Sequence, residues 1–416
     1  MRVLILQGPV GGFFSYLARD LTDRGHTVVK FCFNGGDLLY SSGFRPINYT
    51  GGQRGWRAWL RNFCSNWKPD MILLFGDQRP IHRIAMQIAR ERGIDVYAFE
   101  EGYIRPSYVT FEKGGNNARS PLLRNGMRFA DIEEPPDPAE LRPQFAAMSW
   151  RAVGYYLAKA AGTFLYPGYL HHRRRAVPRE IYQWVRSWVR LLRTQERDRR
   201  LIEQLRSSEA PAFFLVALQV HDDLQLLRHG KGWRNRTLGR AIVESFAANA
   251  LPEDLLVFKV HPMDRGHRHY ETHVLKDARR LGIADRVRVL QSGPLAPVVR
   301  ASKGLITINS SSGIAAIDAG IPVLAFGKAI YNIPGLAKGE ATIADLDQFW
   351  RSPLAPDERL ARRVVAILKR DHMLAGSFYL PETWRQMCEQ VDARLTSEFA
   401  SESIAEREPE PALDGK

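Results

Sequence analysis

Two adjacent glutamates, Glu100 and Glu101, precede Arg105 in the stretch Glu-Glu-Gly-Tyr-Ile-Arg-Pro at residues 100–106. A carboxylate can act as a nucleophile, as a general base, or as a stabiliser of a developing positive charge. The stretch follows the apolar residues 95–99, which predict a strand, and ligands of α/β proteins bind outside the carboxyl ends of strands. We therefore predict that Glu100 and Glu101 are catalytic. For one of the two, an ordinary salt bridge with Arg105 is the alternative.

A second polar cluster, Gly-Asp-Gln-Arg-Pro-Ile-His at residues 76–82, occupies the same position after the predicted strand 71–75. It brings an acid, a cation and an imidazole together in a short span. We predict that Arg79, His82 and Arg105 bind a phosphate or a carboxylate group. The alternative for this cluster is a helix-capping aspartate with unrelated surface neighbours.

The first turn of the chain, Gly-Pro-Val-Gly-Gly at residues 8–12, lacks the glycine spacing of a dinucleotide-binding site and of a P-loop. Gly11 and Gly12 still allow backbone amides to approach an anion at the start of a helix. A tight structural turn is the alternative.

Two motifs in the second half of the chain favour the binding of an anion. Pro262 ends the predicted strand 255–260 and fixes the backbone, so the imidazole before it projects from the strand exit, where it can bind a phosphate. Three serines and a glycine precede the predicted helix 314–319, where hydroxyl groups and free amides lie at the positive end of the helix. N-capping alone needs one serine. The residues predicted to bind this anion are Lys259, His261, Ser310, Ser311, Ser312 and Gly313.

Polar side chains also follow the predicted strand 212–219. Gln219 ends this strand, and Asp223 lies four residues further on. We predict that both contact the donor molecule. Capping of the turn is the alternative for Asp223.

Alternating strands and helices must position these residues. The strand 2–7, the helix 14–24 and the strand 27–33 form a βαβ unit, and a second alternating series begins at residue 212. We therefore predict an α/β fold with two Rossmann-like domains that face each other across a cleft. The predicted units are an N-terminal domain at 1–165, a basic linker helix region at 166–205, a C-terminal domain at 206–375, a helix at 376–400 and a disordered acidic tail at 401–416.

The bulk composition is that of an ordinary globular protein of 416 residues, with 45% hydrophobic and 25% charged residues. No apolar run is long enough for a transmembrane helix or a signal peptide, so we expect a cytoplasmic protein. The three cysteines are widely spaced and show no metal-binding pattern. We expect neither a metal nor a cofactor.

The net charge of +14 indicates an anionic partner, and the basic residues concentrate at 173–200, with ten arginines and three acids. In a helix, apolar side chains at 181, 184, 185, 188 and 192 share one face, and most of the arginines lie off it. This layout predicts a helix that lies on an anionic lipid surface. The alternative is a helix that packs between domains and exposes its arginines to solvent. Binding of nucleic acid is a third interpretation that we do not favour, because no nucleic-acid-binding motif is present.

The serine-rich turn, the helix after it and the Asp-Ala-Gly-Ile-Pro-Val sequence at residues 318–323 resemble the nucleotide-sugar half of GT-B glycosyltransferases. Together with Glu-Glu-Gly in the first half and His-Pro in the second, they also resemble bacterial sialyltransferases and Kdo transferases. Both groups use a CMP-activated sugar acid. This resemblance implies that His261 and the serine turn bind the phosphate of CMP.

A narrower resemblance extends in order from the N-terminus to about residue 340. The chain resembles the KpsS-type family of capsule polysaccharide export and biosynthesis proteins, a β-Kdo glycosyltransferase family. One departure is Ala217, where proline is expected before Leu218 and Gln219. The motifs that carry the resemblance are Gln-Gly-Pro at 7–9, Phe-Asn-Gly-Gly-Asp at 33–37, residues 76–80 and 100–106, Tyr166-Pro167 with His171-His172-Arg173, and Gln219-Val220 with Asp223 and Gln225.

The resemblance implies transfer of β-Kdo from CMP-Kdo to a phosphatidylglycerol-type lipid, which starts the linker of an exported capsule chain. It favours Glu101 as nucleophile or ion-pair stabiliser in a retaining reaction, although an inverting enzyme would use the same carboxylate as a base. Arg79, His82 and Arg105 would bind the acceptor phosphate or the Kdo carboxylate. The implied location is the inner face of the inner membrane, beside other capsule assembly proteins.

Two other functions remain open from the sequence. One is a GT-B transferase that uses CMP-sialate or a UDP-sugar. The other is a non-catalytic component of capsule export.

Overall fold

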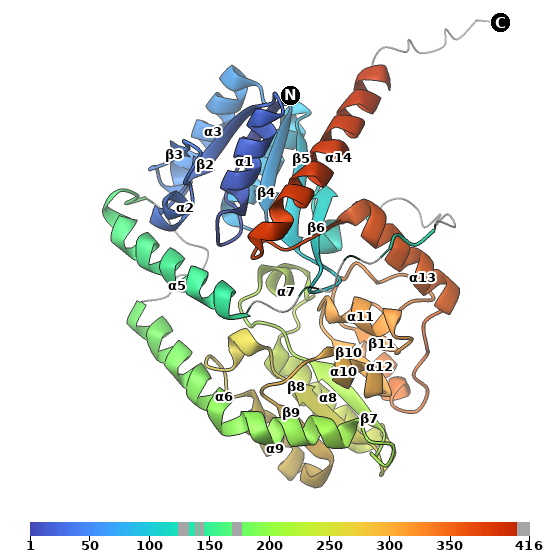
Figure 1. The fold of residues 1–416 in the computed structure, drawn as a ribbon. Coiled ribbons are helices and arrows are strands. Elements are labelled where there is room, and N and C mark those ends of the chain that lie inside the picture. Colours follow the sequence, from blue (N-terminus) through green and yellow to red (C-terminus); the bar gives the residue numbers. More distant parts are fainter. Residues whose placement is uncertain (124–132, 137, 139–140, 142–144, 169–176, 406–416) are drawn as a thin grey trace, which may run out of the picture.

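The computed structural model describes residues 1–416 except 124–132, 137, 139–140, 142–144, 169–176 and 406–416 (Figure 1). Two separate sheets divide the molecule into two α/β units. Each sheet has helices on both faces, which is why its central strands are almost continuously apolar. The predicted fold class is confirmed.

The N-terminal sheet has seven strands in the order β12-β6-β5-β4-β1-β2-β3. The strands β1 to β5 run parallel to one another, whereas β6 pairs antiparallel with both β5 and β12. Their bounds are β1 (Arg2–Ile5), β2 (Thr27–Cys32), β3 (Ile47–Asn48), β4 (Met71–Phe75), β5 (Asp95–Glu101), β6 (Tyr108–Lys113) and β12 (Met373–Ala375).

Alternate residues of β1 enter different cores, as expected for a strand buried on both faces. Val3 and Ile5 pack with α1 (Phe13–Asp23) on one face. On the other face, Leu4 packs with α3 (Gln53–Trp67) and α4 (Pro80–Arg92). The short helix α2 (Gly35–Leu39) also belongs to this unit.

The C-terminal sheet has five parallel strands in the order β11-β10-β7-β8-β9. The strands are β7 (Phe213–Ala217), β8 (Leu255–Lys259), β9 (Val287–Leu290), β10 (Gly304–Thr307) and β11 (Val323–Ala325). The helices are α7 (Leu224–His229), α8 (Asn235–Asn249), α9 (Tyr270–Arg280), α10 (Ala296–Ala301), α11 (Ser312–Asp318), α12 (Ile343–Phe349) and α13 (Glu358–Ile367). This unit therefore repeats the strand–helix alternation of the first.

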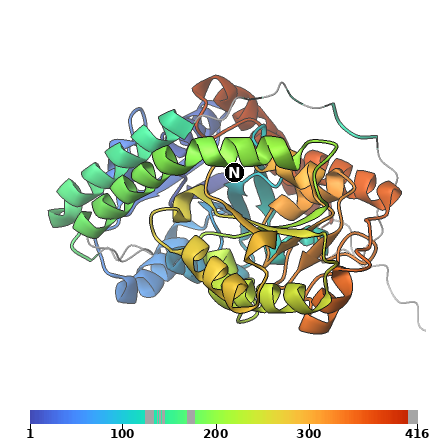
Figure 2. The same ribbon diagram turned by 90° about the horizontal axis from the view of Figure 1, so that it is seen from below.

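Two long helices connect the units. The helix α5 (Phe145–Ala161) packs against α2 of the first unit, and the end of α6 (Val177–Leu205) packs into the second through Ile202 and Leu205. Figures 1 and 2 show the two helices along the same side of the molecule.

After α13 the chain returns to the first unit. The strand β12 pairs with β6, and α14 (Trp384–Ala405) packs against α1. The predicted second domain, which ended at residue 375, was therefore too long by the three residues of β12. Residues 401–405, predicted as disordered, continue α14, and the rest of the predicted tail, 406–416, lies outside the described residues. The sequence had also not indicated the strand β6.

The two units meet at the carboxyl ends of their parallel strands. Asp77 follows β4 and Gln225 lies in α7 after β7, and the Gln225 Nε2 atom donates a hydrogen bond of 3.1 Å to Asp77 Oδ1. Nearby, Tyr103 and Leu122 of the first unit share a core with residues of the second. Side chains at the strand exits of both sheets can thus reach one cleft.

Candidate active site

Glu100 and Glu101 are the last two residues of β5 rather than part of a loop, and they pair with Thr110 and Val109 of β6. Successive side chains of a strand point to opposite faces. The two carboxylates therefore have different surroundings, although they are adjacent in the sequence.

Glu100 lies beside the turn that follows β4. A side-chain carbon at Gly76, which has a φ of +75°, would lie 3.4 Å from Glu100 Oε2, so this glycine leaves room for the carboxyl group. Burial, together with the negative charges of Asp223 and Glu101, raises the pKa of Glu100 to about 8. At neutral pH Glu100 is mostly protonated and can donate a hydrogen bond.

Asp223 brings a carboxylate from the C-terminal unit to the same place. It caps the N-terminus of α7 and accepts a hydrogen bond of 2.8 Å from the backbone N–H of Gln225. Its charge nevertheless acts on Glu100 of the opposite unit. The capping predicted as an alternative for Asp223 is confirmed, and the position beside Glu100 adds a role at the cleft.

Glu101 has a partner that the sequence did not indicate. The hydroxyl group of Tyr379 donates a hydrogen bond of 2.8 Å to Glu101 Oε1. Burial and the charge of Glu101 raise the pKa of Tyr379 well above its ordinary value, so the phenol stays protonated. Tyr379 follows β12 in the segment that returns to the first unit, and no local sequence pattern connects it with Glu101.

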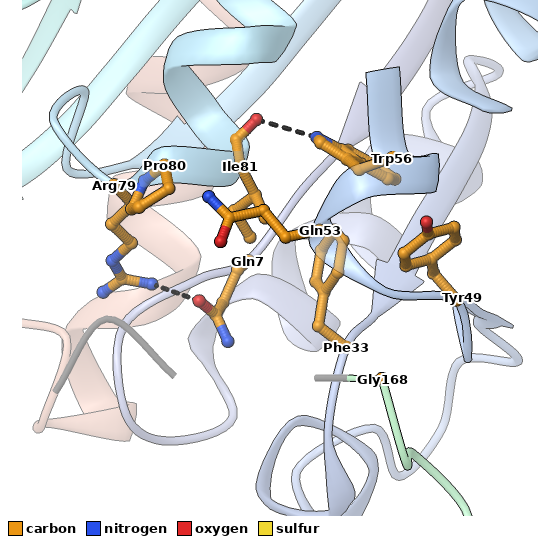
Figure 3. A pocket seen from close by; sticks show the side chains of 10 residues that line it. Gln7, Phe33, Tyr49, Gln53, Trp56, Arg79, Pro80, Ile81 and Gly168 are labelled. Carbon is orange, nitrogen blue, oxygen red and sulfur yellow. Dashed lines mark hydrogen bonds between the residues drawn. The ribbon is translucent and has the colours of Figure 1, made fainter. Parts of the chain in front are cut away.

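Arg79 lies close to the carboxylates and is held by the first turn. It donates hydrogen bonds of 3.0 Å to Gln7 Oε1 and 3.2 Å to the carbonyl of Gly8, and it lies over the ring of Phe75. Figure 3 shows Arg79 and Gln7 pointing toward each other beside a small cavity of about 20 Å³. The positive charge of Arg79 partly opposes the rise in the pKa of Glu100.

The other two members of the predicted anion-binding cluster differ in their access to a ligand. Arg105 is exposed, and its Nε donates to the carbonyl of Gly102. His82 is fully buried, with Nδ1 located 2.8 Å from the carbonyl oxygen of Gly76. Burial lowers the pKa of His82 to about 3, which keeps the ring neutral. In this conformation His82 supports the turn, and the binding of an anion by His82 stays a prediction.

The glycines of the first turn are covered by other elements. Gly12 caps α1, and a side-chain carbon there would lie 3.3 Å from the ring of Trp384 in α14. Gly11 has a φ of +125°, and a side-chain carbon there would lie 3.9 Å from Arg151 in α5. These contacts favour the tight structural turn over an open anion-binding loop.

His261 and Lys259 occupy different environments at the end of β8. His261 is partly exposed and caps a short 3₁₀ turn, and its Nδ1 accepts a hydrogen bond of 3.2 Å from the N–H of Met263. Lys259 is buried, and burial lowers its pKa to about 8. The buried ammonium group donates to the carbonyl of Val260. Lys259 therefore supports the strand end and does not reach the donor in this conformation.

The serine turn has the predicted location between β10 and α11. Ser312 Oγ donates to Ser310 Oγ at 2.9 Å, and the hydroxyl of Tyr331 donates to the carbonyl of Ser310. A side chain at Gly313 would come within 2.2 Å of the Tyr331 ring, so only glycine fits there. Ser310, Ser311 and Ser312 are all partly exposed, and binding of a phosphate by them stays a prediction.

Gln219 connects two strand exits. Its Nε2 donates to Asn309 Oδ1, and its Oε1 accepts from the N–H of Asn309, both at 2.9 Å. Only 7% of the surface of Gln219 is exposed, and its hydrogen bonds join the exits of β7 and β10. The predicted contact with the donor is not supported by this position.

The apolar side chains of the basic helix α6 do not pack against the protein in the way that the packing alternative expected. Trp188 and Val185 are 63% and 56% exposed. In contrast, Arg190 donates to the backbone carbonyls of Arg265 and Arg268 in the C-terminal unit. In the described part of α6 the apolar face is turned to solvent, while Arg190 fixes the helix to the C-terminal unit and Arg199 and Arg200 are 59% and 71% exposed. The exposed arginines agree with the packing alternative and the exposed apolar side chains with a surface-bound helix, so membrane binding stays a prediction.

Within the described residues, no cluster of histidine, cysteine and acidic side chains is arranged to hold a metal ion. The described helices also include none that is long and apolar enough to cross a bilayer. The three cysteines, Cys32, Cys64 and Cys388, are buried thiols.

The two facing Rossmann-like units and the carboxylates at their junction define a protein of the GT-B-like class. The chain belongs to the family of capsule polysaccharide biosynthesis proteins, whose profile matches residues 70–379. The family resemblance noted in the sequence is therefore confirmed.

Individual relatives agree with this assignment. The chain is 34% identical over 364 residues to the capsule polysaccharide export protein KpsS of Escherichia coli, a match that covers 87% of this chain and 92% of the relative. It is 32% identical to the capsule polysaccharide modification protein LipB of Neisseria meningitidis serogroup B, with 91% of each chain covered. Among solved structures, Thermosulfurimonas dismutans KpsC, a β-Kdo 2,7 transferase, matches 90% of this chain and 92% of its own, with 15% identity and a TM-score of 0.46.

Proposed function

We propose that the protein is a glycosyltransferase that moves β-Kdo from CMP-Kdo to a phosphatidylglycerol or lysophosphatidylglycerol acceptor. The product would be the lipid-linked primer of a capsular polysaccharide. The observation that carries this proposal is the position of Glu100 and Glu101 at the end of β5, beside the turn after β4 in which Asp77 accepts a hydrogen bond from Gln225 of the other unit. Membership of a capsule biosynthesis family supports the choice of pathway.

The reaction breaks the bond between the anomeric carbon and the phosphate oxygen of CMP, and positive charge develops on the sugar. Glu101 is the carboxylate that we place at the anomeric carbon, as nucleophile or ion-pair stabiliser in a retaining reaction. The hydrogen bond from Tyr379 fixes one of its oxygens. Asp223 is the rival for this role, because it is charged and approaches from the C-terminal unit.

The other polar groups would bind the two ends of the reacting system. His261 and the serine turn, residues 310–312, would hold the phosphate of the leaving CMP, since hydroxyl and amide donors stabilise a departing anion. Arg105 and Arg79 would bind the acceptor phosphate or the Kdo carboxylate. The acceptor hydroxyl would form the new bond to the anomeric carbon and release its proton to a carboxylate of the cleft or to the departing phosphate, while protonated Glu100 would donate a hydrogen bond within the cleft.

We place the enzyme in the cytoplasm, peripheral on the inner face of the inner membrane, where other capsule assembly proteins could receive its product. The exposed apolar face of α6 supports this location. The net charge of +14 suits a surface of anionic phospholipid.

One experiment separates this proposal from its two rivals. Purified protein is incubated with CMP-Kdo and a short-chain phosphatidylglycerol, and CMP release and the mass of the glycolipid are measured. We expect both products. Consumption of CMP-sialate or a UDP-sugar in place of CMP-Kdo would favour another transferase. Absence of reaction with every donor would favour a non-catalytic role, which the word "export" in the name of the Escherichia coli relative suggests.

A further inference from the structure

A cavity of about 180 Å³ lies where α5 and α6 approach the junction of the two units. Its walls come from six parts of the chain: the turn after β1, the helices α5 and α6, the turns after β7 and β8, and the return segment at Tyr379. The cavity is smaller than the roughly 300–1,000 Å³ of pockets that enclose a drug-sized ligand. It can therefore enclose only part of a large amphipathic molecule.

One end of the cavity is polar and adjoins the candidate catalytic carboxylates. Tyr379 lines it and donates its hydroxyl hydrogen bond to Glu101. His221 lines it as well, and its ring is oriented by buried Asp264, whose Oδ1 lies 2.5 Å from His221 Nδ1. Asp264 also accepts a hydrogen bond of 2.8 Å from Tyr270. A fixed imidazole and a fixed phenol thus lie at the end nearest to the chemistry.

The other end of the cavity is apolar and is formed by the two connecting helices. Met148, Ala152 and Tyr156 of α5 line it at intervals of four residues, which places them on one helical face. Trp184 of α6 lines it from the other side, and 39% of its surface is exposed. Trp184 is therefore both part of the cavity wall and part of the molecular surface.

A second face of α5 carries exposed apolar side chains toward solvent. Trp150, Val153 and Leu157 are 76%, 47% and 65% exposed, and Phe164, just after the helix, is 78% exposed. Trp188 of α6 is also exposed, and Figure 2 shows α5 and α6 running side by side. Exposed apolar patches of this kind mark interaction sites for proteins or membranes.

We propose that this cavity admits the lipid acceptor to the active site. The acyl part of a glycerophospholipid would lie on the exposed apolar side chains of α5 and α6, and its glycerol headgroup would pass Trp184 to the polar end beside Tyr379 and His221. The apolar-to-polar gradient matches an amphipathic molecule, and Asp222 and Asp264 at the polar end can accept hydrogen bonds from the hydroxyl groups of a glycerol headgroup. The net charge of +14 suits an anionic lipid surface outside the cavity. The inference rests on the proposed transfer to a lipid and names the route by which that substrate enters.

The test fills the cavity from one wall. Ala152→Phe adds a ring inside the cavity, and Ala160→Phe makes the same change at an exposed position of α5 that does not line it. Each variant is mixed with lysophosphatidylglycerol that carries bromine atoms on its acyl chain, which quench tryptophan fluorescence on contact. All proteins in this test carry Trp150→Phe and Trp188→Phe, which remove the other exposed indoles of α5 and α6. In this background we expect quenching with Ala152 unchanged and with Ala160→Phe, and loss of most of it with Ala152→Phe and with Trp184→Phe, which removes the reporting indole.

Transfer activity is measured on the same proteins. With Ala152→Phe we expect the KM for the lipid to rise about tenfold, while CMP binding stays as in the wild type. Unchanged quenching and unchanged KM in a folded Ala152→Phe variant would overturn the proposal. If Ala152→Phe does not fold, as judged by CMP binding, Trp184→Ala replaces it, because this change opens the cavity without adding volume. Normal lipid binding by Trp184→Ala would also overturn the proposal.

The two proposals fail in different ways. Lipid-dependent quenching that Ala152→Phe abolishes, in a protein that transfers no sugar from CMP-Kdo, would retain the cavity and refute the proposed reaction. Normal transfer by Ala152→Phe would retain the reaction and refute the cavity.

Discussion

At the residue scale, the adjacent glutamates are distinguished by strand geometry. Glu100 and Glu101 end β5, so their side chains point to opposite faces. Glu100 faces Asp223 and is mostly protonated at neutral pH, while Glu101 is bound by Tyr379. The sequence predicted that only one of the two would perform the central step, and the structure supplies a physical reason for that difference.

Glu101→Gln tests the central step. The substitution keeps the side-chain volume and removes the charge, so we expect kcat to fall by about 10²–10⁴ with CMP binding retained. Isothermal titration with CMP and a steady-state assay of CMP release measure the two effects. As a comparison, Asp223→Asn receives the same assays. Full activity of Glu101→Gln together with an inactive Asp223→Asn would transfer the role to Asp223.

The raised pKa of Glu100 leads to a pH prediction. If protonated Glu100 is the active form, kcat/KM is high below its pKa and falls as the pH rises through about 8. Glutamine resembles the protonated carboxyl group and cannot ionise. We therefore expect Glu100→Gln to keep activity and to lose the decline near pH 8 in a profile of kcat/KM, and persistence of that decline would assign it to another group.

At the element scale, the amphipathic pattern of α6 was predicted from the sequence, but the orientation of the helix on the protein was not. The sequence predicts an amphipathic helix, and the described part of α6 is one. Its arginines do not all face solvent, because Arg190 and Arg197 bind backbone carbonyls of the C-terminal unit. Buried Asp198, which accepts hydrogen bonds from the N–H groups of Gln291 and Ser292, fixes the same end of the helix. The apolar side chains are consequently left outside.

The exposed face of α6 makes a membrane prediction. Trp188→Ser removes a 63% exposed indole, and we expect vesicle binding to weaken by roughly tenfold, since burial of a large apolar side chain contributes about 1.5–3 kcal/mol. Arg199→Gln is the control, because Arg199 already pairs with Glu196 and Glu203. Co-sedimentation with phosphatidylcholine vesicles, with and without phosphatidylglycerol, measures the effect. Equal binding by wild type to both kinds of vesicle would refute selection of anionic lipid.

At the scale of the whole molecule, the last helix completes the first unit. Val391 and Leu395 of α14 are buried in one core with Val3 and Leu17. The N-terminal sheet therefore cannot be completed until the C-terminal unit has been made. The segment between β12 and α14 also brings Tyr379 to Glu101, so completion of the first unit and completion of the site depend on the same segment.

A charge placed in this core tests the dependence. Val391→Asp buries an unpaired carboxylate, and we expect the free energy of unfolding to fall by about 3 kcal/mol or more. Gln386→Asp introduces the same group at an exposed position of α14 and should change stability by less than about 0.5 kcal/mol. Urea unfolding followed by circular dichroism measures both. Similar midpoints for the two variants would show that α14 contributes little to the first unit.

Local pattern was sufficient for most of the fold. The central strand β4 is apolar throughout and has the predicted bounds. The edge strand β9 has them as well, although it contains Arg288. The strand β6 was missed because it contains Thr110 and Glu112, and β12 because it has only three residues. Both are antiparallel additions, and their pairing is a long-range choice that neither segment encodes alone.

The sequence by itself determined the α/β class, the polar strand exits and the family, because these depend on residue types at short spacing. Only the tertiary structure decided which polar groups face the cleft. The structure buries His82, Lys259 and Gln219, while Tyr379 joins the site from the other end of the chain. Burial and contact arise when distant segments pack together, and this is why the Glu100–Glu101 pair could be found from its spacing while its partners could not.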